Sequence, residues 1–452
     1  MSKFISMFSV LLIVGVAVAE ATVDSVMVRQ DWPWSKDIVV QAVVSGAGEG
    51  GVDLAVRAYD GTTDLGEITS AAISSGSLFG AKNGTNSFAI DPRKAFPNAN
   101  TGLFAAFRVE VSVTGEADPL IDRVEYRIID LESPYAVKDL TRRDFYEHPE
   151  LYGAFTKDYS TIGSGFVSSL AANETFVWTG VNDNDAYKTT KLVLKRIPAG
   201  GVAWTMGPSE DDSDAKEAGS WKSPSLGESR VEVQLSKDYF IGVFELTQRQ
   251  YELMTGERPS YYTNMNIWAT RPVEQVALPY SDFVAKIASL HDFSLKIPTE
   301  AQWEFATRAG YSGAGLPNGK ERTDANFGEL EGYSAARSTT DRNTAVKGTC
   351  TVGVGCPNAF GLFNTLGNVT EWVAELPHRD LATCYASKPK PVVDPQITQA
   401  EIQGFANNGV LKGGCYIQVG WSRYAARYSA PRGQVLYSSQ PVWGWRVSMD
   451  AE

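Results

Sequence analysis

The stretch GLFNTLGNVTEWVAE, residues 361–375, decides how the rest of the chain is interpreted. Asn364, Asn368 and Glu371 supply side-chain oxygens, and Gly367 permits a backbone bend that a Cβ would resist. A tight turn that holds oxygen ligands over an apolar base can cradle a hard cation such as Ca²⁺. The alternative is a buried loop whose amides cap its own backbone. Apolar residues that would anchor either arrangement in a core recur at three-residue spacing: Phe363, Leu366, Val369 and Trp372.

Length and composition define the broad class of the protein. With 452 residues, of which 43% are hydrophobic and 21% charged, the chain is globular and long enough for two or three domains. Its net charge of −12 comes from 41 basic and 53 acidic residues. This acidic balance argues against nucleic acid or an anionic membrane as the main partner.

The N-terminus has the pattern of a secretory signal peptide over residues 1–19. Lys3 gives a positive start, FSVLLIVGV (residues 8–16) is an apolar segment, and Ala17 and Ala19 form a cleavage site. The apolar segment is too short to cross a membrane, which takes about 20 residues. We therefore expect an exported protein with no membrane span after cleavage; the alternative is an uncleaved anchor.

Export makes disulfides possible for the four cysteines. Cys350 and Cys356 are close in sequence, which leaves Cys384 and Cys415 as the remaining pair. The sequence allows three pairings and cannot choose between them. For Cys384 and Cys415, a disulfide is favoured over a thiolate metal site because the protein is exported.

Residues 20–131 have the pattern of an all-β domain. β-branched or alternating segments are separated by clusters of Gly, Asn and Pro, which predicts a β-sandwich of the immunoglobulin-like type. No catalytic group of residues is evident there, so a binding or spacer module is expected. Residues 132–190 are mixed and are treated as a connector.

Residues 191–452 have a different pattern, with strands, helices and long irregular connections. Thr247 with Gln250, and Thr299 with Gln302, are capping boxes that begin two helices, and Ser281 begins another. This combination predicts an α+β domain. Its long connections must be held by something besides repeating structure, and metal ions or disulfides are the candidates.

These segments resemble the sulfatase-modifying factor, or formylglycine-generating enzyme, family over about residues 191–449. The resemblance implies a fold similar to a C-type lectin, with little regular structure. It is carried by ordered motifs: LKRIPAGGVAWTMG (194–207), FIGVFELTQRQY (240–251), residues 272–276, IPTEAQWEFATRAG (297–310), NAFGLFNTLGNVTEW (358–372), residues 412–427 and residues 444–446.

The resemblance also implies metal sites. The family's central loop holds calcium through positions that correspond here to Asn364, Gly367, Val369 and Glu371. A second family calcium site corresponds to Asn326 and Phe327. Its Asp ligand falls near Thr344, with Asp341 as a substitute, which puts the second site in doubt. Glu245 lies where the family often has a Glu close to a metal, and it is ranked lower.

The closing motif departs from that of the family's oxidases. These enzymes convert cysteine to formylglycine and resemble one another in Gly-Gly-Ser followed by a copper-binding cysteine pair. Here Cys415 replaces the Ser, Gln418 replaces the first copper cysteine, and no cysteine follows Cys415. Thr370 replaces the Trp that usually lines the pocket. An amide is a poor ligand for Cu(I), so copper is not expected, and Cys415 is the one candidate catalytic residue.

Three function hypotheses follow. The first is a secreted, calcium-stabilised family member that lacks the oxidase activity and binds a protein, peptide or glycan. One candidate surface is a groove lined by aromatic residues; the alternative is that these residues pack in the core. They are Trp421, Tyr424, Tyr428, Trp443 and Trp445. The second is an active formylglycine-generating-type oxidoreductase with an altered site. The third is a structural surface protein with the β-sandwich as a stalk. A three-histidine iron site from His148, His291 and His378 is not expected, because their spacing does not bring them together.

Overall fold

The computed structural model describes residues 20–451 except 31–33, 99–103, 105, 133–134, 157–175, 211, 213–225, 264–265, 277–293, 314–347, 356, 398–400, 402–407, 417–421 and 432–441. The chain divides into two compact units: Met1–Arg123 with Tyr146–Glu150, and Val124–Phe145 with Leu151–Glu452. The predicted signal peptide, the helix expected at Ser281 and the second calcium site at Asn326 and Phe327 lie outside the described residues.

The strands of the first unit form two sheets around one core. The sheet orders are β1-β2-β6-β5 and β4-β3-β7. Val40 and Phe88 from one sheet and Val56 and Val109 from the other belong to a single apolar cluster. Alternate residues of β2 are buried, as period-two patterning requires. The elements are β1 (Thr22–Gln30), β2 (Ile38–Ser45), β3 (Val52–Asp60), β4 (Thr63–Ile68), η1 (Ser70–Ala72), β5 (Ile73–Ser75), β6 (Gly84–Ile90), α1 (Pro92–Ala95) and β7 (Phe107–Glu116).

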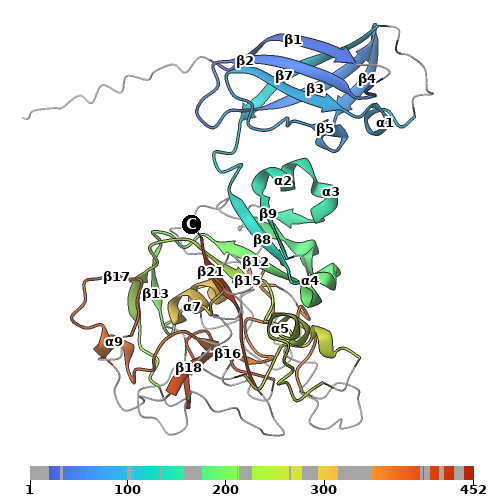
Figure 1. Ribbon diagram of the computed structural model, residues 1–452. Coiled ribbons are helices and arrows are strands. Elements are labelled where there is room, and N and C mark those ends of the chain that lie inside the picture. Colours follow the sequence, from blue (N-terminus) through green and yellow to red (C-terminus); the bar gives the residue numbers. More distant parts are fainter. Residues whose placement is uncertain are drawn as a thin grey trace, which may run out of the picture. The chain divides into compact units, whose positions relative to one another are not determined.

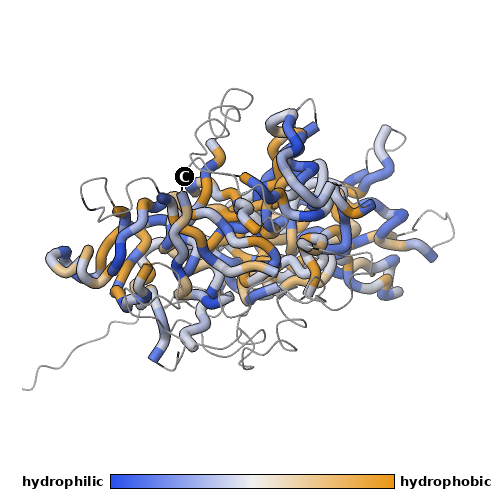
Figure 2. The backbone as a smooth tube through the Cα atoms, turned by 90° about the horizontal axis from the view of Figure 1, so that it is seen from below, coloured by the Kyte–Doolittle hydropathy of each residue, from blue (hydrophilic) through white to orange (hydrophobic). Residues whose placement is uncertain are grey.

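The second unit is a mixed structure, rich in short strands. Its largest sheet has the order β21-β15-β12-β8-β9, beside sheets with the orders β19-β18-β16-β20, β13-β14-β17 and β10-β11 (Figure 1). Hydrophobic and hydrophilic stretches alternate over short distances along the chain (Figure 2), as short strands with one buried face require. The strands are β8 (Val124–Asp130), β9 (Ala136–Thr141), β10 (Phe155–Thr156), β11 (Val177–Trp178), β12 (Lys191–Ile197), β13 (Ala203–Met206), β14 (Val231–Gln234), β15 (Tyr239–Gly242), β16 (Thr370–Val373), β17 (Val392–Val393), β18 (Asn408–Lys412), β19 (Tyr428–Pro431), β20 (Trp443–Gly444) and β21 (Ser448–Asp450).

Two helices of the second unit begin as their capping boxes predicted. Thr247 caps α5 and Thr299 caps α7, and in each box the Gln three residues later returns a hydrogen bond. Left-handed residues end both helices, Gly256 at φ 78° and Ala309 at φ 46°. The helical elements α2 (Arg142–Glu147) and α3 (Pro149–Tyr152) belong partly to each unit, since Tyr146–Glu150 is assigned to the first. The other helical elements of the second unit are η3 (Thr179–Asp183), α4 (Ala186–Thr189), α5 (Gln248–Thr255), η4 (Trp268–Thr270), α7 (Glu300–Arg308) and α9 (Leu381–Cys384). None of the helices in the described part of the chain has the length and apolar character that crossing a bilayer requires.

The boundary between the units differs from the predicted one at residue 131. Strand β8 was expected in the first domain, but it pairs antiparallel with β12 of the second unit, with Val193 opposite Ile128. β9 then extends the same sheet, so much of the predicted connector belongs to the second unit. A strand pattern predicts that a strand exists, but its partner depends on contacts far away in the sequence.

A buried ion triad explains why β8 belongs to this sheet. Glu125 accepts from Arg142 Nε and from Lys195 Nζ, each at 2.7 Å, and all three side chains are buried. Lys195 lies on β12, so removing Glu125 would leave a cation enclosed in the core. Breaking a buried pair in this way is costly, since the remaining charge loses both water and partner.

Glu125→Gln should therefore lower the free energy of unfolding by roughly 3–5 kcal/mol, measured by urea denaturation. Asp139→Asn is the matched control on the neighbouring strand. Asp139 pairs with Arg127 at 2.8 Å, but its side chain is 33% exposed, so its loss should cost only about 0–1 kcal/mol. Equal losses in both variants would contradict the assigned role of Glu125.

Candidate functional site

The central loop before β16 contains four left-handed residues, of which Gly361 at φ 81° is the first. Asn364, Gly367 and Asn368 have φ values of 53°, 93° and 52°. Glycine and asparagine tolerate this region better than other residues, which explains their positions in the loop. Gly367 N donates to Gly413 O at 2.9 Å, which connects the loop to the residue directly after β18.

Glu371 is held by a buried arginine. Its Oε1 accepts from Arg446 Nη2 at 2.8 Å, and both side chains are 1% exposed. Arg446 also donates to the carbonyl oxygens of Gly242, Val243 and Phe363 at 2.8–3.2 Å. One guanidinium therefore connects β16 with the central loop and with the end of β15.

Two further side chains complete this centre. Trp303 Nε1 of α7 donates to Glu371 Oε2 at 2.6 Å. Glu245 is fully buried and accepts from Asn368 Nδ2 at 2.6 Å and from Val369 N at 3.1 Å. Burial, followed by the charge of Glu371, raises the pKa of Glu245 well above its ordinary value.

The predicted calcium ligands thus lie together on one loop, and Glu245 contacts that loop at Val369. Asn364 Oδ1 accepts from Gly353 N at 2.6 Å, and Glu371 is paired with Arg446. Amide, carbonyl and carboxylate oxygens are the donors that Ca²⁺ takes, so the set fits the ion in kind. The cation would share Glu371 with Arg446, whose positive charge lowers the affinity for any second cation.

Cys415 lies in the loop after β18, immediately after two left-handed glycines, Gly413 at φ 89° and Gly414 at φ 69°. A Cβ on Gly414 would lie 2.5 Å from Ser422 Oγ, so only glycine fits there. Cys415 is fully buried and packs with Tyr416 and Val442. Gln418, in the position of the first copper cysteine, lies outside the described residues. A single buried thiol does not fit the family's two-cysteine copper site.

The disulfide expected between Cys384 and Cys415 is not formed. Cys384 is a free, half-buried cysteine on α9, packed against the apolar cluster of β13 and β14. Cys415 belongs to a separate cluster with Tyr416. The sequence order of the cysteines carries no information on their distance in space, and these two residues belong to different apolar clusters.

The remaining sequence candidates are dispersed or buried. Tyr424, Tyr428 and Trp445 are at most 7% exposed, so they are core residues and do not line a groove; Trp421 lies outside the described residues. His148 belongs to the first unit, and His378 is buried in the second. Within the described ranges, no three His, Cys, Asp or Glu side chains are grouped as a metal site.

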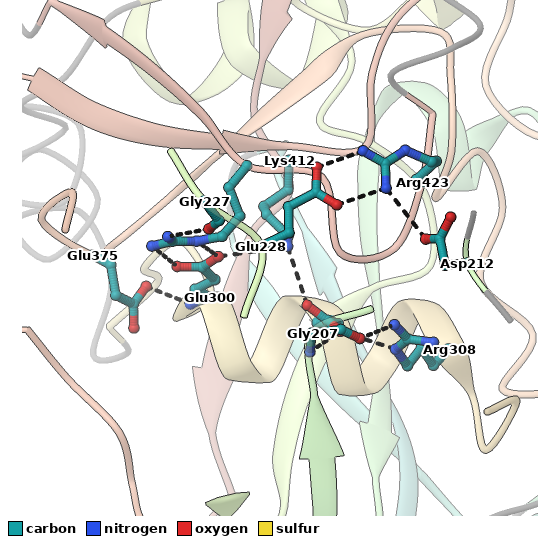
Figure 3. Close-up of polar contacts among 11 residues, drawn as sticks. Gly207, Asp212, Gly227, Glu228, Glu300, Arg308, Glu375, Lys412 and Arg423 are labelled. Carbon is teal, nitrogen blue, oxygen red and sulfur yellow. Dashed lines mark hydrogen bonds and ion pairs between the residues drawn. The ribbon is translucent and has the colours of Figure 1, made fainter. Parts of the chain in front are cut away.

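A buried charge network surrounds α7, and sequence analysis missed it (Figure 3). Glu300 pairs with Arg427 at 2.6 Å, and Glu304 pairs with Arg308 at 2.9 Å. Lys412 of β18 lies 3.1 Å from Glu304 and 3.5 Å from Glu300. The i, i+4 spacing of Glu300, Glu304 and Arg308 was a readable signal, but it normally marks a solvent-exposed helix face.

Two more parts of the network reach other loops. Arg423 forms a bidentate pair with Glu228 and contacts Asp212 at 3.2 Å. Glu375, the last residue of the central stretch, accepts from the backbone N of Glu300 at the start of α7. Burial, followed by the charge of Glu300, raises the pKa of Glu375 to about 8, so this carboxyl group is mainly protonated at neutral pH.

Comparison with known proteins points to one family. The sequence model described as sulfatase-modifying factor enzyme 1-like domain matches residues 182–451. The chain is 33% identical over 162 residues to the formylglycine-generating enzyme of Streptomyces coelicolor, covering 35% of this chain and 47% of that enzyme. It is 30% identical over 156 residues to that of Mycobacterium tuberculosis, covering 33% and 47% respectively. The chain therefore spans about half the length of these curated relatives. Among solved structures, Treponema denticola variable protein 1 is 19% identical with a TM-score of 0.42, covering 58% of this chain and 96% of that one.

The raised pKa of Glu375 makes stability depend on pH. The unfolded carboxyl group loses its proton near pH 4.5, whereas the folded one keeps it to about pH 8. Folding therefore takes up a proton between these limits, and the free energy of unfolding should fall as pH rises, by at most about 1.4 kcal/mol per pH unit.

Glu375→Gln keeps a neutral side chain at every pH, so it should flatten this slope in urea unfolding series between pH 5 and 8. Glu232→Gln on β14 is the control, because Glu232 is exposed. An unchanged slope in Glu375→Gln would rule out Glu375 as the source of the pH dependence.

Proposed function

Because the chain belongs to the sulfatase-modifying factor enzyme 1-like domain family, we propose that it is an exported binding protein that lacks the family's copper-dependent oxidation of cysteine to formylglycine. The signal-peptide pattern supports export, and the net charge of −12 supports a partner other than nucleic acid. The partner class is a protein, peptide or glycan.

One observation carries this proposal. At the closing motif, Cys415 is fully buried against Tyr416 and Val442, and no second cysteine follows it in the sequence. Copper(I) favours a pair of thiolates, and the closing motif of this chain contains one cysteine only. The fold is retained around this position, since the loop, α7 and β18 are joined by buried hydrogen bonds. Because the framework around the closing motif is kept while the copper-binding position is altered, we favour a binding function over an oxidase function.

The first unit is proposed as a second contact module or spacer. Its two sheets resemble the arrangement expected for an immunoglobulin-like sandwich, and the C-type-lectin-like character of the second unit belongs to the same proposal. Both architectures present loops on a rigid framework, which suits recognition of a partner.

The competing function is an oxidoreductase of the formylglycine-generating type with altered chemistry. The identity to two enzymes of that name favours it. The two proposals differ in whether thiol oxidation occurs.

A peptide carrying a sulfatase-type cysteine, incubated with the full chain with and without added copper, should show no oxidation above background by mass spectrometry. Cys415→Ser should behave identically, because the buried thiol has no reactive role. Turnover that Cys415→Ser abolishes would overturn the binding proposal and establish the oxidoreductase.

We propose also that the central loop binds calcium through Asn364, Gly367, Val369 and Glu371, and that the ion adds stability to the loop. Glu371 is unsuitable for testing this, since its removal also breaks the pair with Arg446. Asn364 and Asn368 offer a matched comparison, because both have left-handed φ values that glycine adopts freely.

Asn364→Gly should reduce the difference in Tm between calcium and chelator, because it removes a proposed ligand oxygen. Asn368→Gly should lower Tm equally in both conditions, because it removes bonds to Glu245 and Cys350 only. At ten times Kd, calcium should stabilise the unaltered chain by about 1.4 kcal/mol. Identical Tm values of the unaltered chain in calcium and in chelator would refute the calcium proposal.

A further inference from the structure

A polar cavity of about 200 Å³ lies beside the first turn of α7. Its wall combines segments that are far apart in the sequence: the turn after β14, the start of α7, the residues after β17 and the end of β21. None of the residues that line it belongs to the central loop or to the charge network around α7. At roughly 30 Å³ per water molecule, the cavity has room for about seven waters, which is far more than a single ion needs.

The described lining of this cavity is almost entirely polar, with Leu235 and Pro395 as its apolar residues. Its charged residues are Lys237, Asp238, Lys296, Asp394 and Asp450. Asp238 is neutralised by Arg196, which is not part of the lining, at 2.8 Å. The remaining two lysines and two aspartates balance one another. A ligand cation would therefore be repelled by the lysines, and a ligand anion by the aspartates.

The cavity offers both donors and acceptors of hydrogen bonds. Lys237 is exposed, and its ammonium group makes no hydrogen bond or ion pair within the described part of the chain. Gln302 accepts from Thr299 N through its Oε1 at 3.0 Å, which leaves the N–H groups of its amide available. Asp394 Oδ1 accepts from Ser236 N at 2.8 Å, which leaves Oδ2 available. Donors next to acceptors suit a ligand with several hydroxyl groups, because each hydroxyl group both donates and accepts.

Asp394 is held at the cavity wall by its backbone. Its φ of 45° lies in the left-handed region, where a non-glycine residue is uncommon. Asp394 N donates to Gln234 O at 2.8 Å, and its side chain accepts from Ser236 N, so the backbone and the side chain are both bonded to the chain around the end of β14. Strained residues of this kind persist where the surrounding contacts enforce them, and they are concentrated at ligand sites. The carboxylate is therefore in place before any ligand arrives.

We propose that this cavity is a binding site for one neutral sugar unit. Asp394 accepts from hydroxyl groups of the sugar, and Lys237 and Gln302 donate to them. A metal ion is a poor occupant, because within the described ranges no three His, Cys, Asp or Glu side chains are grouped closely enough to hold one. An apolar molecule is a poor occupant too, since it would displace water from charged groups without replacing the hydrogen bonds. This inference rests on the proposed binding function and selects the glycan from its three partner classes.

The probes are D-glucose, D-galactose and D-mannose, neutral hexoses that differ only in the orientation of their hydroxyl groups. Ligand-observed NMR titration of the full chain should show saturable binding of at least one of them. A Kd on the order of 1 mM is expected for a ligand of this size. Glucosamine and glucuronate, which carry a positive and a negative charge on the same ring, should bind more weakly than the neutral hexose.

Asp394→Asn should weaken hexose binding about tenfold, because it removes a charged acceptor. Its Tm should be unchanged, since Asn also adopts left-handed backbone and its amide oxygen replaces the acceptor for Ser236 N. Lys237→Met should weaken binding to a similar extent without loss of folding, because the side chain is exposed. Glu232→Gln is the matched control: Glu232 is an exposed residue of β14 outside the cavity, so this variant should bind the hexose as the unaltered chain does.

The site would be overturned if none of the three hexoses bound saturably, if Asp394→Asn and Lys237→Met both left the affinity unchanged, or if a charged analogue bound more tightly than the neutral hexose. If Asp394→Asn lowers Tm, Lys237→Met alone decides the question. These measurements record sugar binding and not thiol oxidation. Their failure would therefore leave the proposed function to be judged by the oxidation assay.

Discussion

The second unit depends on the buried ion pair between Arg446 and Glu371. Enclosing two charges costs several kcal/mol per ion, and only close pairing with further hydrogen bonds offsets that cost. Arg446 meets this condition by donating also to carbonyl oxygens of β15 and of the central loop, while Trp303 occupies the second oxygen of Glu371. The pair therefore determines where the central loop, β15, α7 and the closing segment lie relative to one another.

In the charge network around α7, buried charges are likewise stabilised by pairing with opposite charges, and more residues take part. It joins five carboxyl groups, of Asp212, Glu228, Glu300, Glu304 and Glu375, to four cations, Arg308, Lys412, Arg423 and Arg427. With Glu375 protonated, the charges balance. The raised pKa of Glu375 is thus what electroneutrality in a buried space requires, because a fifth negative charge would have no counterpart.

Local features of this fold were predictable from sequence, and long-range ones were not. The capping boxes at Thr247 and Thr299 follow from short motifs whose physics is local. The placement of β8 beside β12 depends on Glu125 meeting Lys195, which lie 70 residues apart. The partner of Glu371 could not be predicted either, because residues 361–375 contain the carboxylate but not the guanidinium of Arg446 that neutralises it. The predicted disulfide between Cys384 and Cys415 was wrong for the same reason, because an even number of cysteines does not show which of them are close in space.

Asn368 shows how the central loop acts beyond its own stability. Its Oδ1 accepts from Cys350 N, and its backbone O accepts from Tyr416 N, at 2.9 and 3.0 Å. One left-handed residue therefore positions both the segment of Cys350 and the turn after β18 that carries Tyr416. The Arg446–Glu371 pair fixes the chain three residues further along, at the start of β16. Because the same loop would position a reacting group equally well, retention of the loop alone says nothing about catalysis. The side chains around Cys415 decide the chemistry, and Asn368 also holds the segment of a second buried free thiol, Cys350.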